Sequence, residues 1–427
     1  MDSKVTVIGT GYVGLTTGAC FAHLGHDVTC ADIDADKVER LSRGEIPIHE
    51  PGLGEIVQEG LRAERLRFTT DTRAAVRDAG FVYLCVPTPQ GQDGSADLSY
   101  LQAAAEEIGP YVESDTVVVN KSTVPVGSAN FVEQVMGRTD VHVVSNPEFL
   151  REGSAVHDFL NPDRVVIGSD DQSAAIRVAG LYLGLPAPVL VTDPASAETI
   201  KYASNAFLAM KLSFVNAVAN LCESLGADVS DVVLGMGYDK RIGREFLRPG
   251  PGWGGSCFPK DSRALQYMAR DAGYDFTILD TLLASNDEQF DRVADKVERI
   301  VGGDLGGSKV AAWGLTFKAN TDDRRDSPAV EVLRRLVARG AHVTAYDPTV
   351  AGSIAELPEV EVADDVYGAV EGADALVVLT EWDEFKWADL DKVAELMALP
   401  RIVDGRNLLD RSQVRRRGFE YDGIGRR

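Results

Sequence analysis

The chain has 427 residues, of which 44% are hydrophobic and 26% charged, and this size and composition are typical of two or three packed folded units. Its formal net charge of -23 at pH 7 argues against an extended nucleic-acid surface, which needs clustered Lys and Arg. The five cysteines are odd in number and lack CxxC spacing, so we expect reduced thiols and no metal site. No uninterrupted apolar run has the roughly 18 to 20 residues of a membrane span.

The first strand is expected to begin at Lys4, which leaves no room for a signal segment before it and predicts a cytoplasmic protein. Residues 4–32 show the pattern of a βαβ unit: an apolar strand, a glycine-rich turn, a helix of small residues and a second strand that closes on Asp32. Strands alternating with helical stretches predict a parallel sheet covered on both faces. Further strands are predicted within 81–89, 116–125, 142–149, 165–170 and 188–193.

A single long helix is predicted from Pro194 to Gly226, because apolar residues recur there at helical spacing. Asp193 or Ser196 could cap its start, and Gly226 could end it. At 1.5 Å per residue it would span about 45 Å, so we expect a spine that joins two lobes and could supply a dimer interface.

A second α/β pattern follows at 309–318, 327–340, 342–348, 373–382 and 401–407. Its opening turn, GLTFKAN, lacks GxGxxG, so this lobe is expected to bind a different ligand. The predicted fold class is therefore α/β, with two Rossmann-like doubly wound lobes joined by a long central helix. The predicted domains are 1–193, which carries the glycine-rich turn after the first strand, 194–304, which carries the spine, and 305–427, which binds the second ligand.

Gly9, Gly11 and Gly14 form GxGxxG directly after a strand and before a helix, and Asp32 closes the next strand. The glycines allow a tight turn, close approach of a pyrophosphate and helix–strand packing. Asp32 can bind a ribose hydroxyl but would repel a 2′-phosphate, which predicts NAD in preference to NADP. Lys37 could reach the adenosine, although an exposed helical Lys is commonly just solvated. The alternative for the glycines is a packed turn without a ligand.

The segment GPGWGGSCFPKD (250–261) combines four glycines with Cys257 and Lys260. Glycines suit close approach to a bulky ligand, and a nearby cation or N–H donor makes a thiol nucleophilic. A buried packing cysteine is the alternative. In a dehydrogenase, such a thiol predicts oxidation of an alcohol to a carboxylate: hydride transfer, thiohemiacetal formation, a second hydride transfer to give a thioester, and hydrolysis.

Six segments in chain order carry a family resemblance: GTGYVG (9–14), STVPVG (122–127), NPEFLREGSAVHDF (146–159), KYASN (201–205), GPGWGGSCFPKD (250–261) and GLTFKANTDDRRDSP (314–328). They resemble the UDP-glucose/GDP-mannose dehydrogenase family over nearly the whole chain. The resemblance implies a nucleophile, donors to the oxyanion, a carboxylate that works with the lysine through a water, a base and a residue that holds a water. The nucleophile is Cys257, the oxyanion donors are Lys201 and Asn205, and the carboxylate is Asp261. The base is Glu148, and Thr123 holds the water.

The resemblance also implies binding residues. For NAD they are Gly9, Gly11, Tyr12, Val13, Gly14, Asp32, Lys37, Pro87, Thr88, Ser122, Thr123, Glu152 and Arg325. For the sugar nucleotide they are Glu148, Phe149, Leu150, Lys201, Asn205, Arg241, Phe246, Leu247, Gly254, Lys318 and Arg406. Arg241 matches a position that reaches the substrate from a partner subunit, which implies a homodimer. Each assignment has an alternative. Lys201 and Asn205 could be ordinary polar residues on the helix surface, Glu148 could be a capping or loop residue, and Arg325 could belong to a surface ion-pair cluster.

Within the family, KYASNAFLAMKLSFVN, DKRIGREFL and SCFPKD look most like members that oxidise UDP-glucose to UDP-glucuronate, with GDP-mannose or another nucleotide sugar as the alternative. A one-step hydroxyacid dehydrogenase shares the N-terminal pattern but leaves Cys257 without a role. A nucleotide sensor that has lost its chemistry would need none of Cys257, Lys201, Asn205 and Asp261 as a set.

Overall fold

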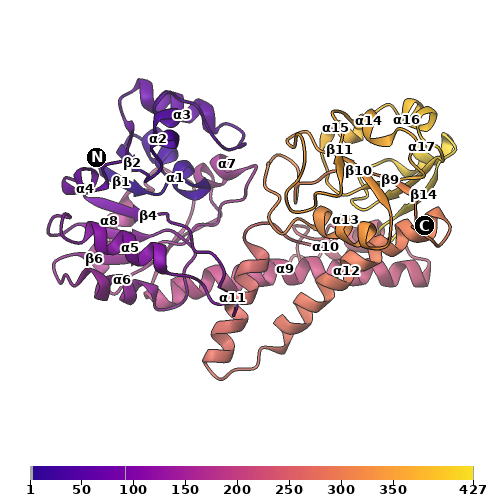
Figure 1. Cartoon of the computed structure of the whole chain (residues 1–427). Helices are drawn as coiled ribbons and strands as arrows, with labels where there is room; N and C mark the ends of the chain where they lie inside the picture. Colours follow the sequence, from indigo (N-terminus) through magenta and orange to yellow (C-terminus); the bar gives the residue numbers. More distant parts are fainter. Residues whose placement is uncertain (1–2, 92, 427) are drawn as a thin grey trace. The chain divides into compact units, whose positions relative to one another are not determined.

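The computed structural model describes residues 3–91 and 93–426. By its internal contacts the chain divides into two compact units. The N-terminal unit comprises Met1–Ser204 and Arg263–Ala272, and the C-terminal unit comprises Asn205–Ser262 and Gly273–Arg427. Each unit contains one sheet with helices on its faces (Figure 1).

The N-terminal sheet has the strand order β3-β2-β1-β4-β5-β6-β7-β8. Its strands are β1 (Lys4–Ile8), β2 (Asp27–Ala31), β3 (Leu66–Thr69), β4 (Phe81–Leu84), β5 (Val117–Asn120), β6 (His142–Ser145), β7 (Val165–Gly168) and β8 (Val189–Thr192). The helices between them are α1 (Tyr12–His23), α2 (Ala35–Ser42), α3 (Leu53–Arg62), α4 (Thr72–Arg77), α5 (Ser99–Ile108), α6 (Ser128–Met136), α7 (Ala155–Leu160) and α8 (Gln172–Gly180). Buried aliphatic side chains on both sheet faces form two core clusters, as expected for a sheet covered on both sides.

The predicted parallel sheet extends from β3 to β6, and the last two strands run in the opposite direction. Strands β3 to β6 run parallel, but β6 and β7 pair antiparallel through Ser145 and Gly168. The chain therefore enters β7 from the side of the sheet where β6 ends, and it does not cross back to the amino ends of the parallel strands. As a result, the segment after β6, which contains the NPEFL motif, stays at the carboxyl ends of the parallel strands.

Helix α9 (Pro194–Leu225) confirms the predicted spine. Asp193 caps it, because its Oδ1 accepts a hydrogen bond from Ser196 N at 2.8 Å, and Gly226 ends it with φ +76°. Within the described residues, α9 is long and apolar enough to cross a membrane by length and composition alone, which is weak evidence since core helices share both properties. Its buried polar residues have protein partners, as in a core helix: Glu198, Lys201, Asn205, Ser213 and Asn216.

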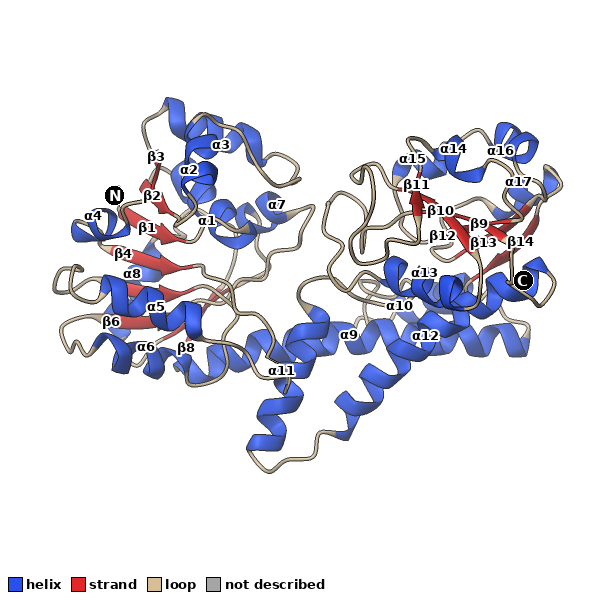
Figure 2. Ribbon diagram, in the orientation of Figure 1, coloured by secondary structure: helices blue, strands red, loops and turns tan. Residues whose placement is uncertain are grey.

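The C-terminal unit contains a wholly parallel sheet in the order β11-β10-β9-β12-β13-β14 (Figure 2). Its strands are β9 (Lys309–Trp313), β10 (His342–Tyr346), β11 (Glu361–Val362), β12 (Ala375–Val378), β13 (Arg401–Asp404) and β14 (Glu420–Gly423). The remaining helices are α10 (Val229–Gly237), α11 (Phe258–Asp271), α12 (Thr277–Val301), α13 (Pro328–Ala338), α14 (Val366–Val370), α15 (Asp383–Lys386), α16 (Leu390–Leu396) and α17 (Arg411–Arg416). The predicted second doubly wound lobe is thus confirmed.

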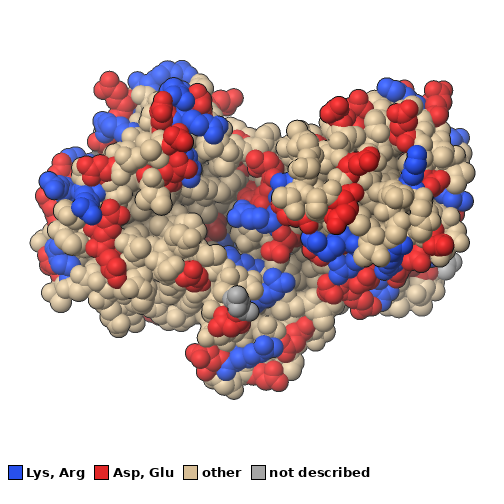
Figure 3. Space-filling model, viewed as in Figure 1, with Lys and Arg blue, Asp and Glu red and all other residues tan. Residues whose placement is uncertain are grey.

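Charged side chains of both signs are interspersed on the face drawn in Figure 3. Acidic groups exceed basic ones over the chain, with 66 Asp and Glu against 43 Lys and Arg. This excess suits binding of small ligands in built sites better than binding of a polyanion along the surface.

Candidate active site

Three glycines shape the turn between β1 and α1. The backbone of Gly9 has φ +90°, and a Cβ there would lie 2.6 Å from the carbonyl oxygen of Cys85. A Cβ at Gly14 would overlap the carbonyl oxygen of Gly9, whereas one at Gly11 would meet nothing within 4 Å. Gly11 is also the N-cap of α1, where free N–H groups favour an anion. Two packed glycines and one open glycine therefore fit a dinucleotide pyrophosphate.

Asp32 follows β2 and lies beside this turn. Its Oδ2 accepts hydrogen bonds from N and Oγ1 of Thr10 at 2.8 and 2.5 Å and lies 3.0 Å from Lys37 Nζ. Its Oδ1 accepts a bond from Asp34 N at 3.1 Å. Burial opposes ionisation, but the hydrogen bonds outweigh it and lower the pKa of Asp32 to about 2. The side chain stays 11% exposed, so an ionised oxygen can reach a ribose hydroxyl.

The loops after β4 and β5 meet at the carboxyl ends of these strands. Thr88 Oγ1 donates to the carbonyl oxygen of Thr123 at 2.9 Å, and Ser122 Oγ donates to that of Val86 at 2.6 Å. Pro87 is exposed within the first loop. Four predicted cofactor residues therefore lie together at the edge where open α/β sheets bind ligands.

Tyr12 contacts Glu50, a residue that our sequence analysis missed. The Tyr12 hydroxyl bonds to the Glu50 carboxylate, and Gly153 N donates to both groups, at 3.0 and 2.6 Å. Burial and the neighbouring Glu50 raise the pKa of Tyr12 well above its usual range. Glu152 precedes Gly153 and so belongs to this loop, while Val13 packs on the core. The cluster fixes the start of α1 against the segment that leads into α7.

Glu148 and Lys201 form a buried ion pair within the N-terminal unit. Lys201 Nζ lies 2.7 Å from Glu148 Oε1 and donates to the Glu148 carbonyl oxygen at 2.6 Å. The other carboxylate oxygen accepts a hydrogen bond from Leu150 N at 2.6 Å. The two side chains are only 5% and 4% exposed. Two residues with predicted catalytic roles are thus placed together, as a base and a cation beside each other.

The ring of Phe149 lies near two cations. The guanidinium carbon of Arg164 is 3.6 Å from the ring centroid, and Lys201 Nζ is 5.4 Å from it. Burial lowers the pKa of Arg164. Cations over an aromatic ring are attracted by its quadrupole, so they hold the ring of this predicted substrate residue in place. Arg164 was missed because the sequence NPDRV gives no sign of this contact.

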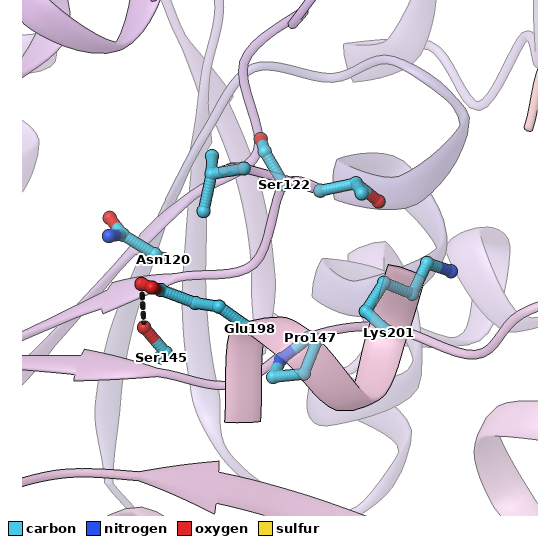
Figure 4. A pocket seen from close by; sticks show the side chains of 8 residues that line it. Asn120, Ser122, Ser145, Pro147, Glu198 and Lys201 are labelled. Atoms are coloured by element: carbon cyan, nitrogen blue, oxygen red, sulfur yellow. Dashed lines mark hydrogen bonds between the residues drawn. The ribbon is translucent and has the colours of Figure 1, made fainter. Parts of the chain in front are cut away.

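A small pocket lies in the same unit, next to the loop that carries Ser122 and Thr123 (Figure 4). Lys201 and Glu198 reach it from α9. Asn120 also lines this pocket, and neither the oxygen nor the nitrogen of its buried amide has a hydrogen-bond partner among the described residues. No motif in the sequence singles out Asn120 or Glu198.

Cys257 is the residue directly before α11. Asp261 N donates to its carbonyl oxygen at 2.8 Å, and its Sγ lies 3.6 Å from Ser256 Oγ. It is partly exposed, and the other four cysteines of the chain are buried: Cys20, Cys30, Cys85 and Cys222. Burial raises the pKa of the Cys20 and Cys85 thiols to about 12. Since a helix N-terminus favours negative charge, Cys257 is the cysteine whose position suits a reactive thiolate.

Asp261 is 1% exposed and binds two donors within the C-terminal unit. Asn205 Nδ2 donates to its Oδ2 at 2.6 Å, and Lys260 Nζ donates to its Oδ1 at 2.7 Å. Asn205 lies one turn after Lys201 on α9, as the spacing predicted. The predicted partnership of Asp261 with Lys201 stays a prediction.

The glycines of the cysteine loop serve close packing against the chain itself. A Cβ at Gly252 would overlap the Phe290 ring, and a Cβ at Gly254 would overlap the Asp326 carbonyl oxygen. A Cβ at Gly255 would lie 2.8 Å from the Phe317 ring. Our expectation that these glycines admit a bulky ligand is therefore incomplete, because neighbouring chain segments occupy the space beside them. Phe246 at the start of this region has φ +60° and lies 6.2 Å from the ring of Phe258, and Leu247 is buried.

The acid that follows β10 explains why the second sheet lacks a dinucleotide site. Asp347 occupies the same place as Asp32 in the first sheet, but it is 1% exposed. Its Oδ2 accepts hydrogen bonds from Leu315 N, Thr316 N and Oγ1, and Trp382 Nε1 at 2.8 to 3.1 Å. With its acceptor sites occupied by the protein, Asp347 is not available to a ribose.

Cations occur at the carboxyl ends of β9 and β13. Arg406 donates to the carbonyl oxygens of Leu379 and Phe317 at 2.8 and 2.9 Å and pairs with Glu381 at 3.1 Å. Lys318 Nζ lies 5.3 Å from the Phe317 ring centroid. These two predicted substrate residues are thus brought together in the C-terminal unit, where a diphosphate could meet both cations.

Two predicted arginines lie on the surface. Arg241 is 89% exposed and bonds to Asp239, and Arg325 is 66% exposed and bonds to Asp323. The pairing of Arg325 agrees with the surface ion-pair alternative, and its cofactor role stays a prediction. Among the described residues, no group of three or more His, Cys, Asp or Glu side chains is placed to hold a metal ion.

Comparison with known proteins decides the family. The model of the UDP-glucose/GDP-mannose dehydrogenase family matches through its NAD binding domain at residues 3–185, its central domain at 195–288 and its UDP binding domain at 311–411. The chain belongs to this family. NAD is therefore its cofactor, and the open Gly11 turn and the ionised Asp32 described above fit this group.

Relatives and solved structures agree with this assignment. The chain is 48% identical to a UDP-glucose 6-dehydrogenase of Rhizobium meliloti, over 99% of both chains. It is 46% identical to UDP-glucose 6-dehydrogenase TuaD of Bacillus subtilis, over 99% of this chain and 93% of that protein. A solved UDP-glucose dehydrogenase of Pyrobaculum islandicum superimposes with a TM-score of 0.91 and 38% identity, covering 100% of this chain and 98% of the other.

Proposed function

We propose that this chain oxidises the primary alcohol of UDP-glucose to the carboxylate of UDP-glucuronate, with two NAD consumed per sugar. The observation that carries this proposal is Cys257, the partly exposed cysteine at the start of α11, in a chain whose other cysteines are buried. A dehydrogenase that stopped at the aldehyde would need no such thiol. The high identity to UDP-glucose dehydrogenases over the full chain supports UDP-glucose over GDP-mannose.

In this mechanism NAD accepts the hydride in each oxidation step when bound. The buried pair of Glu148 and Lys201 handles protons and charge: Glu148 accepts a proton from the reacting hydroxyl or a water, and the Lys201 ammonium stabilises the developing oxyanion. Cys257 adds to the aldehyde carbon to form a thiohemiacetal, and loss of a second hydride leaves a thioester. Thr123 holds the water that replaces the sulfur, and this water releases the carboxylate.

Asn205 and Asp261 form the second part of the proposed catalytic set. The Asn205 amide offers a donor to the oxyanion, and its bond to the Asp261 carboxylate fixes the orientation of that amide. Lys260, bonded to the same carboxylate, places positive charge three residues from the thiol. We propose that the three predicted segments, 1–193, 194–304 and 305–427, divide the work into NAD binding, catalysis and binding of UDP.

The homodimer is supported by an exposed apolar row on α9. Phe207, Phe214 and Leu221 recur every seven residues, and each exposes more than half of its surface, at 57%, 55% and 55%. Side chains seven apart lie on nearly the same side of a helix, so the row is continuous. Burial of this row against the same row of a second copy would stabilise the dimer by about 25 cal/mol for each Å² of apolar surface that leaves water. We propose such a dimer in the cytoplasm, with Arg241 reaching the partner's substrate.

Counting NADH against sugar tests the function. Purified protein is incubated with excess NAD and a limiting amount of UDP-glucose, GDP-mannose or a UDP-N-acetylhexosamine. We expect two NADH per UDP-glucose and slow turnover of the others. One NADH per sugar would contradict the thiol mechanism, and faster turnover of GDP-mannose would contradict the substrate assignment.

A further inference from the structure

Glu198 is a buried carboxylate on α9, three residues before Lys201, and it is 2% exposed. Its oxygens accept hydrogen bonds from Gly127 N at 2.7 Å, Ala129 N at 3.1 Å and Ser145 Oγ at 2.7 Å. These donors come from the start of α6 and the end of β6. Glu198 therefore joins three chain segments at one point, through a side chain that the reaction scheme does not use.

The donors show which segment is held. Helix α6 begins at Ser128, and the first N–H groups of a helix have no partner within the helix. Glu198 supplies acceptors to two N–H groups at this end. The loop that enters α6 is STVPVG, which carries Thr123, the proposed holder of the hydrolytic water. An anchor at the end of this short loop limits the positions that Thr123 can take.

The pocket in Figure 4 relates this anchor to the chemistry. It is lined by Thr123 and Ser122 from the loop and by Glu198 and Lys201 from α9. Asn120 also lines it, and the buried amide of this residue has no hydrogen-bond partner among the described residues. A buried amide without a partner is costly, and a small pocket with several polar residues in its lining suits an ordered water molecule. The anchor and the loop thus border a site with the chemistry to bind water.

We propose that Glu198 is a positioning residue for the hydrolysis step: it anchors the 122–127 loop at the start of α6 so that Thr123 holds the attacking water. This inference rests on the proposed function. Glu198 touches neither substrate nor cofactor in this scheme, and it acts through Thr123 alone. Loss of the anchor should slow release of the thioester and leave the two hydride transfers, which need no water, nearly unchanged. A displacement of about 1 Å at such a site can slow a step by about 10²-fold.

The test uses the full chain with Glu198→Gln, which keeps the shape but places an amide N–H against backbone N–H donors. Stopped-flow absorbance follows NADH, and intact mass spectrometry follows the protein. We expect a rapid burst of two NADH per subunit, a steady rate about 10- to 100-fold below wild type, and a UDP-sugar acyl adduct that Cys257→Ser abolishes. Glu133→Gln, the same change at an exposed position on α6, should behave as wild type.

The outcomes separate this inference from the proposed function. If wild type produces no NADH from UDP-glucose, the proposed function fails and this inference fails with it. If wild type is active but E198Q shows neither burst nor adduct while its melting temperature stays within a few degrees of wild type, the inference alone is wrong. Should E198Q not fold, Ser145→Ala removes one of the three donors, and a smaller adduct is expected; its absence would overturn the proposal.

Discussion

Replacing Asp32 with Ala should change which dinucleotide the enzyme uses. The ionised carboxylate accepts bonds from Thr10 and Asp34, and its remaining acceptor capacity suits a ribose hydroxyl. A hydrogen bond to a charged group contributes about 1.5 to 3 kcal/mol, so NAD binding should weaken by about 10- to 150-fold. Removal of the negative charge also lifts its repulsion of a 2′-phosphate about 4 Å away, which is about 1 kcal/mol in water and more at a partly buried site. The two effects together should raise the ratio of kcat/KM for NADP to kcat/KM for NAD by about 10²- to 10³-fold.

The assay compares kcat/KM for NAD and NADP in the two proteins, with calorimetric binding of each dinucleotide as a second measurement. Lys37, which lies 3.0 Å from Asp32, loses its partner in the variant and can pair with the added phosphate. Asp34→Ala is the matched control, because it removes a nearby carboxylate that caps α2. An unchanged cofactor ratio in D32A would refute our placement of the adenosine pocket.

The same residue sets a pH expectation. Because hydrogen bonds hold the pKa of Asp32 at about 2, below its usual 3.8, the carboxylate is ionised throughout the range in which the enzyme is assayed. The contribution of this lowered pKa to stability is present above pH 4 and is lost as the pH falls from about 4 to 2. The difference in NAD affinity between wild type and D32A should therefore be constant from pH 5 to 8. A difference that falls toward pH 5 would show that the carboxylate protonates there.

Three further changes test other parts of the structure. Cys257→Ser should block carboxylate formation while NAD binding, measured by calorimetry, stays intact; normal turnover would remove the covalent mechanism. Gly14→Ala places a Cβ onto the Gly9 carbonyl oxygen, so NAD affinity should fall by at least 10-fold and the melting temperature should drop; wild-type affinity would contradict the packed turn. Phe214→Glu should convert the proposed dimer to monomer in light scattering, while Ile176→Glu, at a 61% exposed position outside α9, should not. Dimers in both variants would place the interface elsewhere.

The sequence predicted those features that depend on local pattern. GxGxxG followed by an acid predicted the βαβ unit, because Gly9 has a positive φ and a Cβ at Gly14 would overlap the carbonyl oxygen of Gly9 within the same turn. The ends of α9 followed from Asp193 and Gly226, since capping is also local. Cys257 is more than 50 residues from Lys201 and Asn205 in the sequence. Only the family resemblance predicted that these residues act together.

Features that depend on distant chain segments were not accessible in this way. The reversal of β7 depends on whether the chain crosses the sheet after β6, and strand residues such as VVIG read the same in either direction. The packing of Gly252, Gly254 and Gly255 depends on Phe290, Asp326 and Phe317, which lie 38 to 72 residues later. The buried bonds of Glu198 join α6 and β6 through a residue that the sequence shows only as one more acid on a helix.

The two sheets show that the fold alone does not decide the ligand. Each sheet has a strand, a turn, a helix and a second strand that closes on an aspartate, at Asp32 and Asp347. In the first sheet the turn is short and leaves Asp32 partly exposed, so one carboxylate oxygen can serve a ribose. In the second sheet the longer turn folds back over Asp347 and uses its oxygen for Leu315, Thr316 and Trp382. Ligand choice in this chain therefore follows from whether the protein satisfies that carboxylate itself, since a satisfied buried acid has no acceptor left to offer.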